Sequence, residues 1–348
     1  MFSFLRPYIF GLDPETAHDL AIKSLKYNFI PESFFHVENE EILSTDLFKK
    51  KLKNPIGLAA GFDKSAEVYN SLFRLGFGFV EVGTITPKKQ LGNPKPRIFR
   101  LEKDNAMINR LGFNNEGLKT ILDRLSKNTP NEFLGINIGP NKDTKNKILD
   151  FLKCLESLHI HANYITINIS SPNTEGLRSF HEKELLSELL TQVYKLKKNK
   201  KINTPVVLKL SPDISDIEIS NINELILKYK VDGIILTNTT NQNRGILTDR
   251  NKNEKGGLSG VPIRALSLKF IKKFFKDNKG KIPIIGVGGI DDGHSAFEMI
   301  TAGASVIQLY TGMVFKGPGI VKNIKSGLVE ILAKEKIKNI KHAIGINS

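Results

Sequence analysis

The chain has 348 residues, of which 40% are hydrophobic and 25% are charged, a composition typical of globular proteins. This length fits one large domain or two ordinary ones. The formal net charge of +15 invites a nucleic-acid-binding interpretation. We favour a solvated basic surface instead, because the lysine clusters lie outside the motif-bearing loops and have no interleaved aromatic residues. Attraction to an anionic membrane surface stays open.

The cysteine content and the apolar segments limit the class of protein further. The single cysteine, Cys154, lies in a predicted helix, where we interpret it as a packing residue. One thiol excludes an internal disulfide framework and is typical of a reducing compartment. No apolar stretch approaches the ~20 residues that span a bilayer. The apolar residues 1–10 contain Arg6 and Pro7 and lack a small-residue cleavage site, which argues against a signal peptide.

The N-terminal segment, residues 1–45, is predicted to be a helical extension outside the main domain. Asp13 as N-cap and Pro14 at the first helical position predict a helix. Ala17, Leu20, Ala21 and Leu25 give this helix an apolar face, and residues 2–10 form a second apolar segment. Two interpretations remain even on the residues alone. The segment is either a helical pair that caps the main domain, or a small apolar site that faces a membrane or a greasy substrate.

After residue 54, short Val/Ile/Leu-rich runs alternate with helical segments of 3.6-residue periodicity. The runs are nearly continuous, as expected of parallel strands buried on both faces. Ser215 to Glu218 forms a capping box before one of the helices. The alternation predicts an α/β fold, a (β/α)8 TIM barrel over residues 46–340, which needs ~250 residues. The expected strands are 55–60, 78–84, 133–139, 164–170, 205–210, 232–237, 283–287 and 305–310.

Polar residues and glycines follow the C-terminal ends of these strands, where a TIM barrel places its catalytic groups. The most informative end is 168–174, in which Ser-Ser-Pro-Asn breaks an alternating strand. Residues 286–289 and 310–312 offer glycine amides of the kind that bind phosphate, although turn formation explains either loop alone. Residues 85–114 form the longest insertion, predicted to be a hairpin-like excursion over the barrel mouth.

Amide and lysine side chains are expected to converge at the barrel mouth. Amides offer both donors and acceptors, which suits a planar ring rich in heteroatoms, such as a flavin or a pyrimidine. A buried lysine there would stabilise negative charge on a reduced cofactor or an enolate. For Lys209 the alternative of a surface lysine is weakened by the apolar residues 206–208 before it. The converging residues are Asn137, Asn168, Asn173, Asn238, Lys64 and Lys209.

Metal chemistry and nucleophile–histidine catalysis are not indicated. His159 and His161 precede the fourth strand at the wrong end of the barrel, and the strand ends carry neither an HExxH motif nor paired carboxylates. Asp63 is the main acidic residue there, and we expect it to bond backbone in a tight loop. Ser171 is the remaining candidate for proton transfer, but on the residues alone turn formation explains this serine better.

A series of long motifs runs in order through nearly the whole chain. They are AAGFDK at 59–64, EVGTITP at 81–87, GNPKPRIFRL at 92–101, NRLGFNNEG at 109–117, NISSPNTEGLR at 168–178, TNTT at 237–240, GGLSG at 256–260, GVGGI at 286–290 and LYTG at 309–312. In these motifs the chain closely resembles the dihydroorotate dehydrogenases, specifically class 2, the membrane-associated and quinone-dependent class.

The resemblance implies a reaction and a mechanism. It implies oxidation of (S)-dihydroorotate to orotate, the fourth step of pyrimidine biosynthesis, with one FMN per chain and a membrane quinone as electron acceptor. Ser171 is similar to the base that abstracts the substrate C5 proton while the hydride passes to FMN. Class 1 relatives use cysteine there, and this chain has none near it. The segment from Ser171 to about His181 would then be a lid that delivers the base and excludes water.

The resemblance also implies the binding residues. Lys64 would lie beside the substrate carboxylate. The substrate-binding residues it implies are Lys64, Asn109, Arg110, Leu111, Gly112, Phe113, Asn168, Asn173, Asn238 and Thr239. The FMN-binding residues it implies are Ala60, Gly61, Phe62, Asp63, Lys64, Thr84, Asn137, Asn168, Lys209, Thr237, Gly260, Gly289, Tyr310 and Thr311.

The N-terminal helices resemble the quinone-entry domain of class 2, which decides between the two interpretations of residues 1–45. A bacterial enzyme is implied, peripheral on the cytoplasmic face of the inner membrane, without mitochondrial presequence or anchor. The expected partners are dihydroorotate and orotate, a membrane quinone and an anionic membrane surface, with no nucleic acid. A monomer is favoured, while the oligomeric state and the identity of the quinone stay open.

Three rival functions are opposed by particular residues. A class 1 enzyme that uses fumarate or NAD is opposed by Ser171, by the N-terminal extension and by the lack of an iron–sulfur cysteine set. An FMN barrel that oxidises a 2-hydroxy acid needs a strand-end histidine, which this chain lacks. A lipid- or nucleic-acid-binding barrel without catalysis leaves the strand-end loops unexplained.

Overall fold

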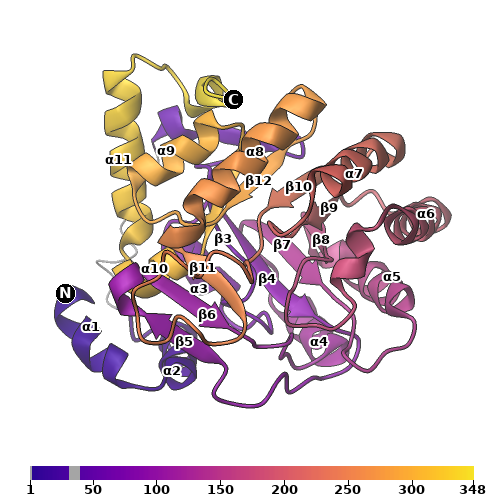
Figure 1. The fold of residues 1–348 in the computed structure, drawn as a ribbon, viewed down its shortest axis with the longest axis horizontal. Coiled ribbons are helices and arrows are strands. Elements are labelled where there is room, and N and C mark those ends of the chain that lie inside the picture. Colours follow the sequence, from indigo (N-terminus) through magenta and orange to yellow (C-terminus); the bar gives the residue numbers. More distant parts are fainter. Residues whose placement is uncertain (1, 31–39) are drawn as a thin grey trace.

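The computed structural model describes residues 2–30 and 40–348, and its centre is a closed barrel of eight parallel strands (Figure 1). The strands follow one another around the barrel in chain order, and the last, β13, pairs with the first, β3. The predicted (β/α)8 barrel is therefore confirmed, with every expected strand present. The barrel strands are β3 (Ile56–Leu58), β4 (Phe79–Ile85), β7 (Phe133–Ile138), β8 (Tyr164–Asn168), β9 (Val206–Lys209), β10 (Gly233–Leu236), β12 (Ile284–Val287) and β13 (Val306–Leu309).

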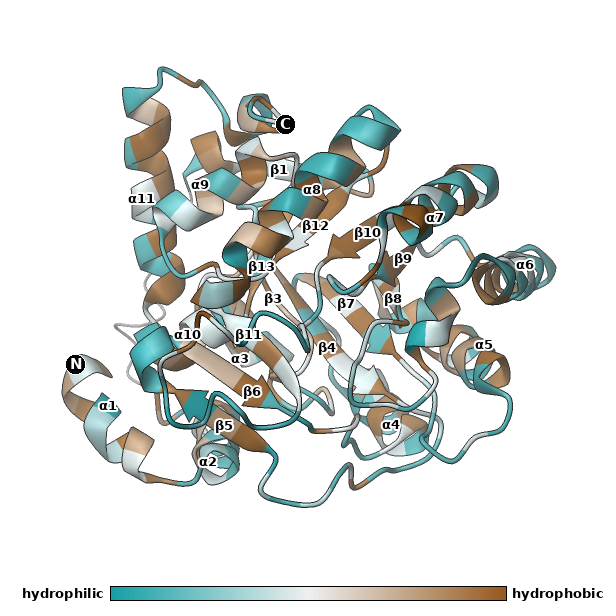
Figure 2. Cartoon of the chain, in the orientation of Figure 1, coloured by the Kyte–Doolittle hydropathy of each residue, from teal (hydrophilic) through white to brown (hydrophobic). Residues whose placement is uncertain are grey.

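Helices surround the barrel and pack their apolar faces against it (Figure 2). The capping box predicted before α7 is present, since Ser215 Oγ accepts from Glu218 N and Glu218 accepts from Ser215 N at 2.7 Å. Cys154 is buried in α5 as a packing residue. The helices of this layer are α3 (Tyr69–Arg74), α4 (Leu118–Lys127), α5 (Lys147–Leu158), α6 (Lys183–Asn199), α7 (Asp216–Tyr229), α8 (Arg264–Asn278), α9 (Gly293–Thr301), α10 (Thr311–Lys316) and α11 (Ile320–Lys334).

A short hairpin, β1 (Thr45–Leu47) and β2 (Lys50–Leu52), closes the N-terminal end of the barrel. Its turn residue Phe48 packs against Tyr164, with ring centroids 5.6 Å apart, at the start of β8. The sequence did not predict this hairpin, because its strands are three residues long and β2 begins with two exposed lysines.

The excursion predicted at residues 85–114 is confirmed as the antiparallel pair β5 (Ile98–Leu101) and β6 (Ala106–Asn109). A third strand, β11 (Gly257–Gly260), pairs with β6 and completes a separate three-stranded sheet. The residues of GGLSG do not predict this strand, because three glycines in five residues weaken a strand signal.

The described part of the N-terminal extension is a pair of helices, α1 (Phe2–Gly11) and α2 (Pro14–Lys26), beside β5 (Figure 1). Asp13 caps α2 as predicted, accepting from the amides of Glu15 and Thr16 at 3.0 Å. Glu15 then receives two bonds from the buried Arg97, at 3.0 and 2.5 Å, which fasten α2 to the excursion. Residues 1 and 31–39 of the expected segment 1–45 lie outside the described residues.

Candidate active site

A cavity opens at the C-terminal ends of the barrel strands, with the β5–β6–β11 sheet as one wall. Polar strand-end residues meet there although they are far apart in sequence. The predicted residues that line the cavity are Ala60, Gly61, Lys64, Thr84, Asn109, Leu111, Gly112, Phe113, Asn168, Ser171, Asn173, Lys209, Thr237, Asn238, Thr239, Gly260, Gly289, Tyr310 and Thr311. We call this the strand-end cavity.

The floor of the strand-end cavity is a hydrogen-bonded network of amides. Asn168 Nδ2 donates to Asn137 Oδ1 at 3.1 Å and to Thr84 Oγ1 at 3.2 Å. Thr84 Oγ1 donates to Asn137 Oδ1 at 2.6 Å, and Ser170 Oγ donates to Asn168 Oδ1 at 2.9 Å. Because both ends of the Asn168 amide are bonded, its orientation is fixed before any ligand binds.

A buried carboxylate, Glu81, lies beneath this floor and near the buried Lys209, which lines the cavity. Glu81 accepts from Asn137 at 2.7 Å, from the Tyr164 hydroxyl at 2.8 Å and from Gln308 Nε2 at 2.9 Å. Burial lowers the pKa of Lys209, and the nearby Glu81 charge opposes that shift. Gln308 Oε1 is buried without a partner, so this cavity wall holds an unused acceptor for a ligand N–H.

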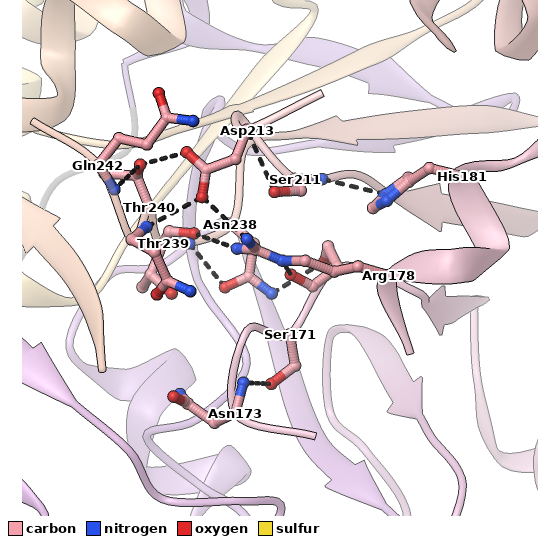
Figure 3. Close-up of polar contacts among 12 residues, drawn as sticks. Ser171, Asn173, Arg178, His181, Ser211, Asp213, Asn238, Thr239, Thr240 and Gln242 are labelled. Atoms are coloured by element: carbon pink, nitrogen blue, oxygen red, sulfur yellow. Dashed lines mark hydrogen bonds and ion pairs between the residues drawn. The ribbon is translucent and has the colours of Figure 1, made fainter. Parts of the chain in front are cut away.

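Ser171 lies on the cavity wall just past β8 (Figure 3). Its Oγ accepts from the Asn173 amide at 3.3 Å, which is turn geometry, and among the described residues no histidine or carboxylate bonds to it. The nearby His181 is buried, its Nε2 accepts from Ser211 N at 3.4 Å, and burial lowers its pKa to about 4. Within the described part of the chain, the Ser171 hydroxyl therefore has no general base bonded to it.

Lys64 joins the cavity to the N-terminal extension. Its Nζ lies 3.2 Å from Nε2 of His18 on α2. Burial lowers the pKa of Lys64 to about 8, although Glu15 and Asp19 oppose that shift. Burial and the Lys64 charge lower the pKa of His18 well below its usual value, so the neutral imidazole accepts a hydrogen bond from the ammonium. Lys64 is thus a preformed anchor for an anionic ligand group.

Glycine backbone surrounds the part of the cavity between β11 and β12. Gly260, Gly288 and Gly289 have φ values of 99°, 127° and 75°, where side chains are strained. A Cβ on Gly289 would approach Arg264 Cβ to 2.6 Å. Beside Gly260, the Thr311 hydroxyl bonds to Ser259 Oγ at 2.8 Å. Such a site lets a ligand approach exposed amides and hydroxyls, which suits a phosphate group.

A second cavity, with a volume of about 290 Å³, lies between α1, α2 and α10. Its lining is mainly apolar, and we call it the helix cavity. Ile98, Met107 and Tyr310 line both cavities and form the wall between them. Arg100 is the main charged group in the helix cavity, and its Nη1 donates to Phe10 O and to Leu12 O at 3.0 Å. This lining suits an apolar ring ligand.

The sequence profile of the family described as "Dihydroorotate dehydrogenase" matches residues 42–332. The chain belongs to the dihydroorotate dehydrogenase family. It is 44% identical to a "Dihydroorotate dehydrogenase (quinone)" from Christiangramia forsetii over 94% of this chain and 98% of that protein. It is 42% identical to a protein of the same name from Rhodopseudomonas palustris, over 98% of this chain and 94% of the other.

Solved structures agree with this family membership. The crystal structure of DHODH from Eimeria tenella in complex with ferulenol has a TM-score of 0.91 and 38% identity, covering 97% of this chain and 98% of that one. The ligand-free form from the same organism has a TM-score of 0.90. The expected resemblance, the fold and the assignment as an oxidoreductase are therefore confirmed.

Four of the predicted site residues do not line the strand-end cavity. The Asp63 carboxylate turns back to accept from Glu67 N at 2.7 Å and Val68 N at 2.8 Å, the structural role we expected, and burial raises its pKa to about 6. Phe62 turns instead toward His18, with ring centroids 5.1 Å apart. The tight loop after β3 thus directs the side chains of Phe62 and Asp63 away from the strand-end cavity.

The other two residues lie beneath and beside the cavity. Asn137 is fully buried in the floor network, because its amide bonds Glu81 and Asn168. Arg110 points outward, where it pairs with Glu254 at 2.8 Å and stacks over Phe99, 4.5 Å from the ring centroid. The strand-end position of Asn137 and the family motif around Arg110 locate each residue near the cavity, but neither gives the direction in which the side chain points.

Sequence reasoning missed three residues of this site. His18 was hidden among the apolar positions of α2, although a histidine on an apolar helix face was a usable signal. Ser259 lies inside the quoted GGLSG motif and was not singled out. Gln308 precedes the quoted LYTG motif and lies within an expected strand, where the strand pattern does not mark its buried amide as a site residue.

Proposed function

We propose that this protein oxidises (S)-dihydroorotate to orotate with one bound FMN and passes the electrons to a membrane quinone, as the fourth step of pyrimidine biosynthesis. One observation carries the proposal. A polar cavity that fits a carboxylated ring and a flavin shares the wall Ile98, Met107 and Tyr310 with an apolar cavity that fits a quinone. The names of the relatives, dihydroorotate dehydrogenase (quinone), support it further.

The residues present fit FMN. The glycines Gly260 and Gly289, with Thr311, would hold its phosphate through amides and a hydroxyl. The buried Lys209 ammonium and the unpartnered Gln308 Oε1 would meet the ring, one as cation and one as acceptor. When bound there, FMN supplies the acceptor for the substrate hydride.

The substrate would bind by its carboxylate and its ring amides. The protonated Lys64 would pair with the carboxylate. Asn173 and Asn109 lie together, with Asn173 Nδ2 donating to Asn109 O at 3.1 Å. Asn238 is oriented by a bond from its Nδ2 to Ser170 Oγ at 2.8 Å, and Thr239 N donates to its Oδ1 at 2.7 Å. These amides offer both donors and acceptors to a pyrimidine ring.

Ser171 would take the C5 proton. Its Oγ would accept this proton and release the hydroxyl proton toward solvent. Since no histidine assists Ser171 among the described residues, the rate depends on how the segment after β8 places the hydroxyl and excludes water.

The extension supports the quinone and membrane parts of the proposal. The helix cavity would hold the quinone head, with Tyr310 between it and the flavin site. Phe4 is 75% exposed and Tyr8 is 71% exposed on α1, where both suit partial insertion into a lipid interface. Among residues 2–30 and 40–348 no helix is long and apolar enough to cross a bilayer. We place the protein peripherally on the cytoplasmic face of the inner membrane, with residues 1–45 as the quinone segment and 46–340 as the catalytic domain.

The proposal is tested by assaying dihydroorotate oxidation with a quinone, and with fumarate and NAD as alternative acceptors. We expect a yellow protein whose flavin band bleaches with dihydroorotate and returns with quinone. A folded protein that takes up no FMN, or whose bound FMN is not reduced by dihydroorotate, would contradict the proposal.

A further inference from the structure

The segment after β8 carries Ser171 and, seven positions later, Arg178 at the start of η5 (Arg178–His181). The Arg178 guanidinium reaches three loops at once (Figure 3). Its Nε donates to Ser170 O at 3.2 Å and its Nη2 donates to Thr239 O at 3.2 Å. Its Nη1 donates to Asp213 Oδ2 at 2.9 Å. One planar group therefore joins the ends of β8, β9 and β10.

Asp213 is a largely buried acceptor for this guanidinium, and several hydrogen bonds hold it in place. Its side chain is 7% exposed, against 26% for Arg178. Beyond Arg178 it accepts from the Thr240 hydroxyl, and from Asn241 N at 2.9 Å. Its own amide donates to Ser211 Oγ at 3.1 Å. Charge-assisted bonds in such a sheltered place are stronger than exposed ion pairs.

We propose that Arg178, held by Asp213, is a positioning residue that sets the place of Ser171 relative to the substrate. Arg178 touches neither substrate nor cofactor in this assignment, which rests on the proposed function. The Ser170 carbonyl belongs to the peptide that leads into Ser171, so fixing this carbonyl fixes the base. The same fork holds the carbonyl of Thr239, a residue of the substrate-binding wall. Arg178 therefore fixes the spacing between base and substrate site.

The segment has a second anchor that does not depend on Arg178. Leu177 and Phe180 are buried, and the ring of Phe180 packs edge-on against Phe151 of α5, with centroids 5.9 Å apart. Between the two ends, Glu175 and Gly176 are exposed. Loss of the guanidinium should therefore loosen the stretch from Ser170 to Gly176 while the fold, the FMN site and the helix cavity stay intact.

The test is stopped-flow measurement of the two half-reactions in the FMN-loaded Arg178→Ala variant. We expect reduction of the flavin by saturating dihydroorotate to slow by on the order of 100-fold, since a misplacement of about 1 Å costs that much. The deuterium isotope effect at substrate C5 should rise, because proton abstraction becomes slower. Reoxidation by quinone and FMN content should not change.

Two further variants keep the proposal testable if Arg178→Ala does not fold. Arg178→Lys keeps the charge but loses the fork, so we expect an intermediate rate. Asp213→Asn should slow flavin reduction in the same direction, and combined with Arg178→Lys it should add little, because both act through one contact. Lys183→Ala is the matched control, since Lys183 pairs with Glu224 in an exposed ion pair on neighbouring helices.

Hydrogen exchange gives a readout besides activity. In FMN-loaded Arg178→Ala, the backbone amides of Ser171 and of residues 173–176 should exchange faster, while those of β9 and β10 keep their protection. The inference would be overturned if the flavin of Arg178→Ala were reduced at the wild-type rate. It would also be overturned if the variant lost FMN and both half-reactions in parallel. If the wild-type flavin itself is not reduced by dihydroorotate, the proposed function fails first, and the inference falls with it.

Discussion

The strand-end cavity and the helix cavity share a wall but are built in opposite ways. The first is lined by side chains whose amides and hydroxyls bond one another, as Asn168 does with Asn137 and Thr84. The second is lined mostly by apolar side chains of α1, α2 and α10 and has no comparable polar network among its described lining residues. A polar, preorganised site suits proton and hydride transfer, and an apolar site suits exchange of a lipid-soluble electron carrier.

One contact crosses between these two parts of the molecule. His18 lies on α2 and lines the helix cavity, yet its ring lies 3.2 Å from Nζ of Lys64 in the strand-end cavity. The extension therefore does more than cover the barrel, since it helps to hold the lysine that we assign to the substrate carboxylate. We therefore expect most substitutions to affect only one half-reaction, and substitutions at the contact of His18 with Lys64 to affect substrate binding.

The largest effect is expected from Ser171→Ala, in the strand-end cavity. We expect flavin reduction by dihydroorotate to fall by about 10²- to 10⁴-fold at neutral pH, the usual contribution of a positioned base, with reoxidation by quinone unchanged. Rapid-mixing absorbance at the flavin band measures both steps. Glu175→Ala is the matched control, because Glu175 is exposed in the same segment. An unchanged single-turnover rate would remove Ser171 from the mechanism.

Filling the helix cavity should give the reverse pattern. Ala17 of α2 lines this cavity, so Ala17→Phe should raise the KM for quinone by roughly 10- to 200-fold, since a pocket loses about 1–3 kcal/mol for a misfitted group. Flavin reduction should keep its rate. Lys23→Ala, at an exposed position of the same helix, is the control. Equal slowing of both half-reactions by Ala17→Phe would show that the cavities are not separate in function.

The pH dependence of substrate binding tests the role that we assign to Lys64. Its pKa is lowered to about 8 by burial, so the ammonium that pairs with a carboxylate is lost as pH rises through that value. The Kd for orotate should then rise by up to about tenfold per pH unit above pH 8, and be flat below. Flavin difference spectra measure it. Lys64→Gln should bind weakly and lose this dependence, and the same slope in that variant would contradict the assignment.

The smallest effect is expected at the surface of α1 that we propose contacts the membrane. Replacing Phe4 and Tyr8 by serine should weaken binding to vesicles of anionic lipid by roughly threefold for each side chain, because rings at an interface are only partly buried. Flotation with vesicles measures the bound fraction, and catalysis with a soluble short-chain quinone should not change. Identical flotation of the variant and the parent protein would remove α1 from membrane binding.

The parts that the sequence could predict are those with a periodic or local signal. Buried parallel strands such as β7 and β8 are unbroken apolar runs, so all eight were found, and the cap at Asp13 was visible in three consecutive residues. Because strand C-terminal ends meet at one face of a barrel, the cavity followed from the order of the strands.

The parts that could not be predicted depend on contacts between distant residues. Strand β11 forms only because β6, some 150 positions earlier, offers it an edge. The contact of His18 with Lys64 and that of Arg178 with Asp213 span 46 and 35 positions and have no periodic pattern. Arg110 shows a different limit. Its motif predicts a position at the site, but the ion pair with Glu254 holds its side chain outside the cavity.

The most direct test of the division between the cavities is rapid-mixing measurement of both half-reactions in Ser171→Ala and Ala17→Phe, side by side with the parent protein. We expect a crossed pattern, in which Ser171→Ala slows only flavin reduction by dihydroorotate and Ala17→Phe slows only flavin reoxidation by quinone. Slowing of the same half-reaction by both variants, or of both half-reactions by each, would contradict it.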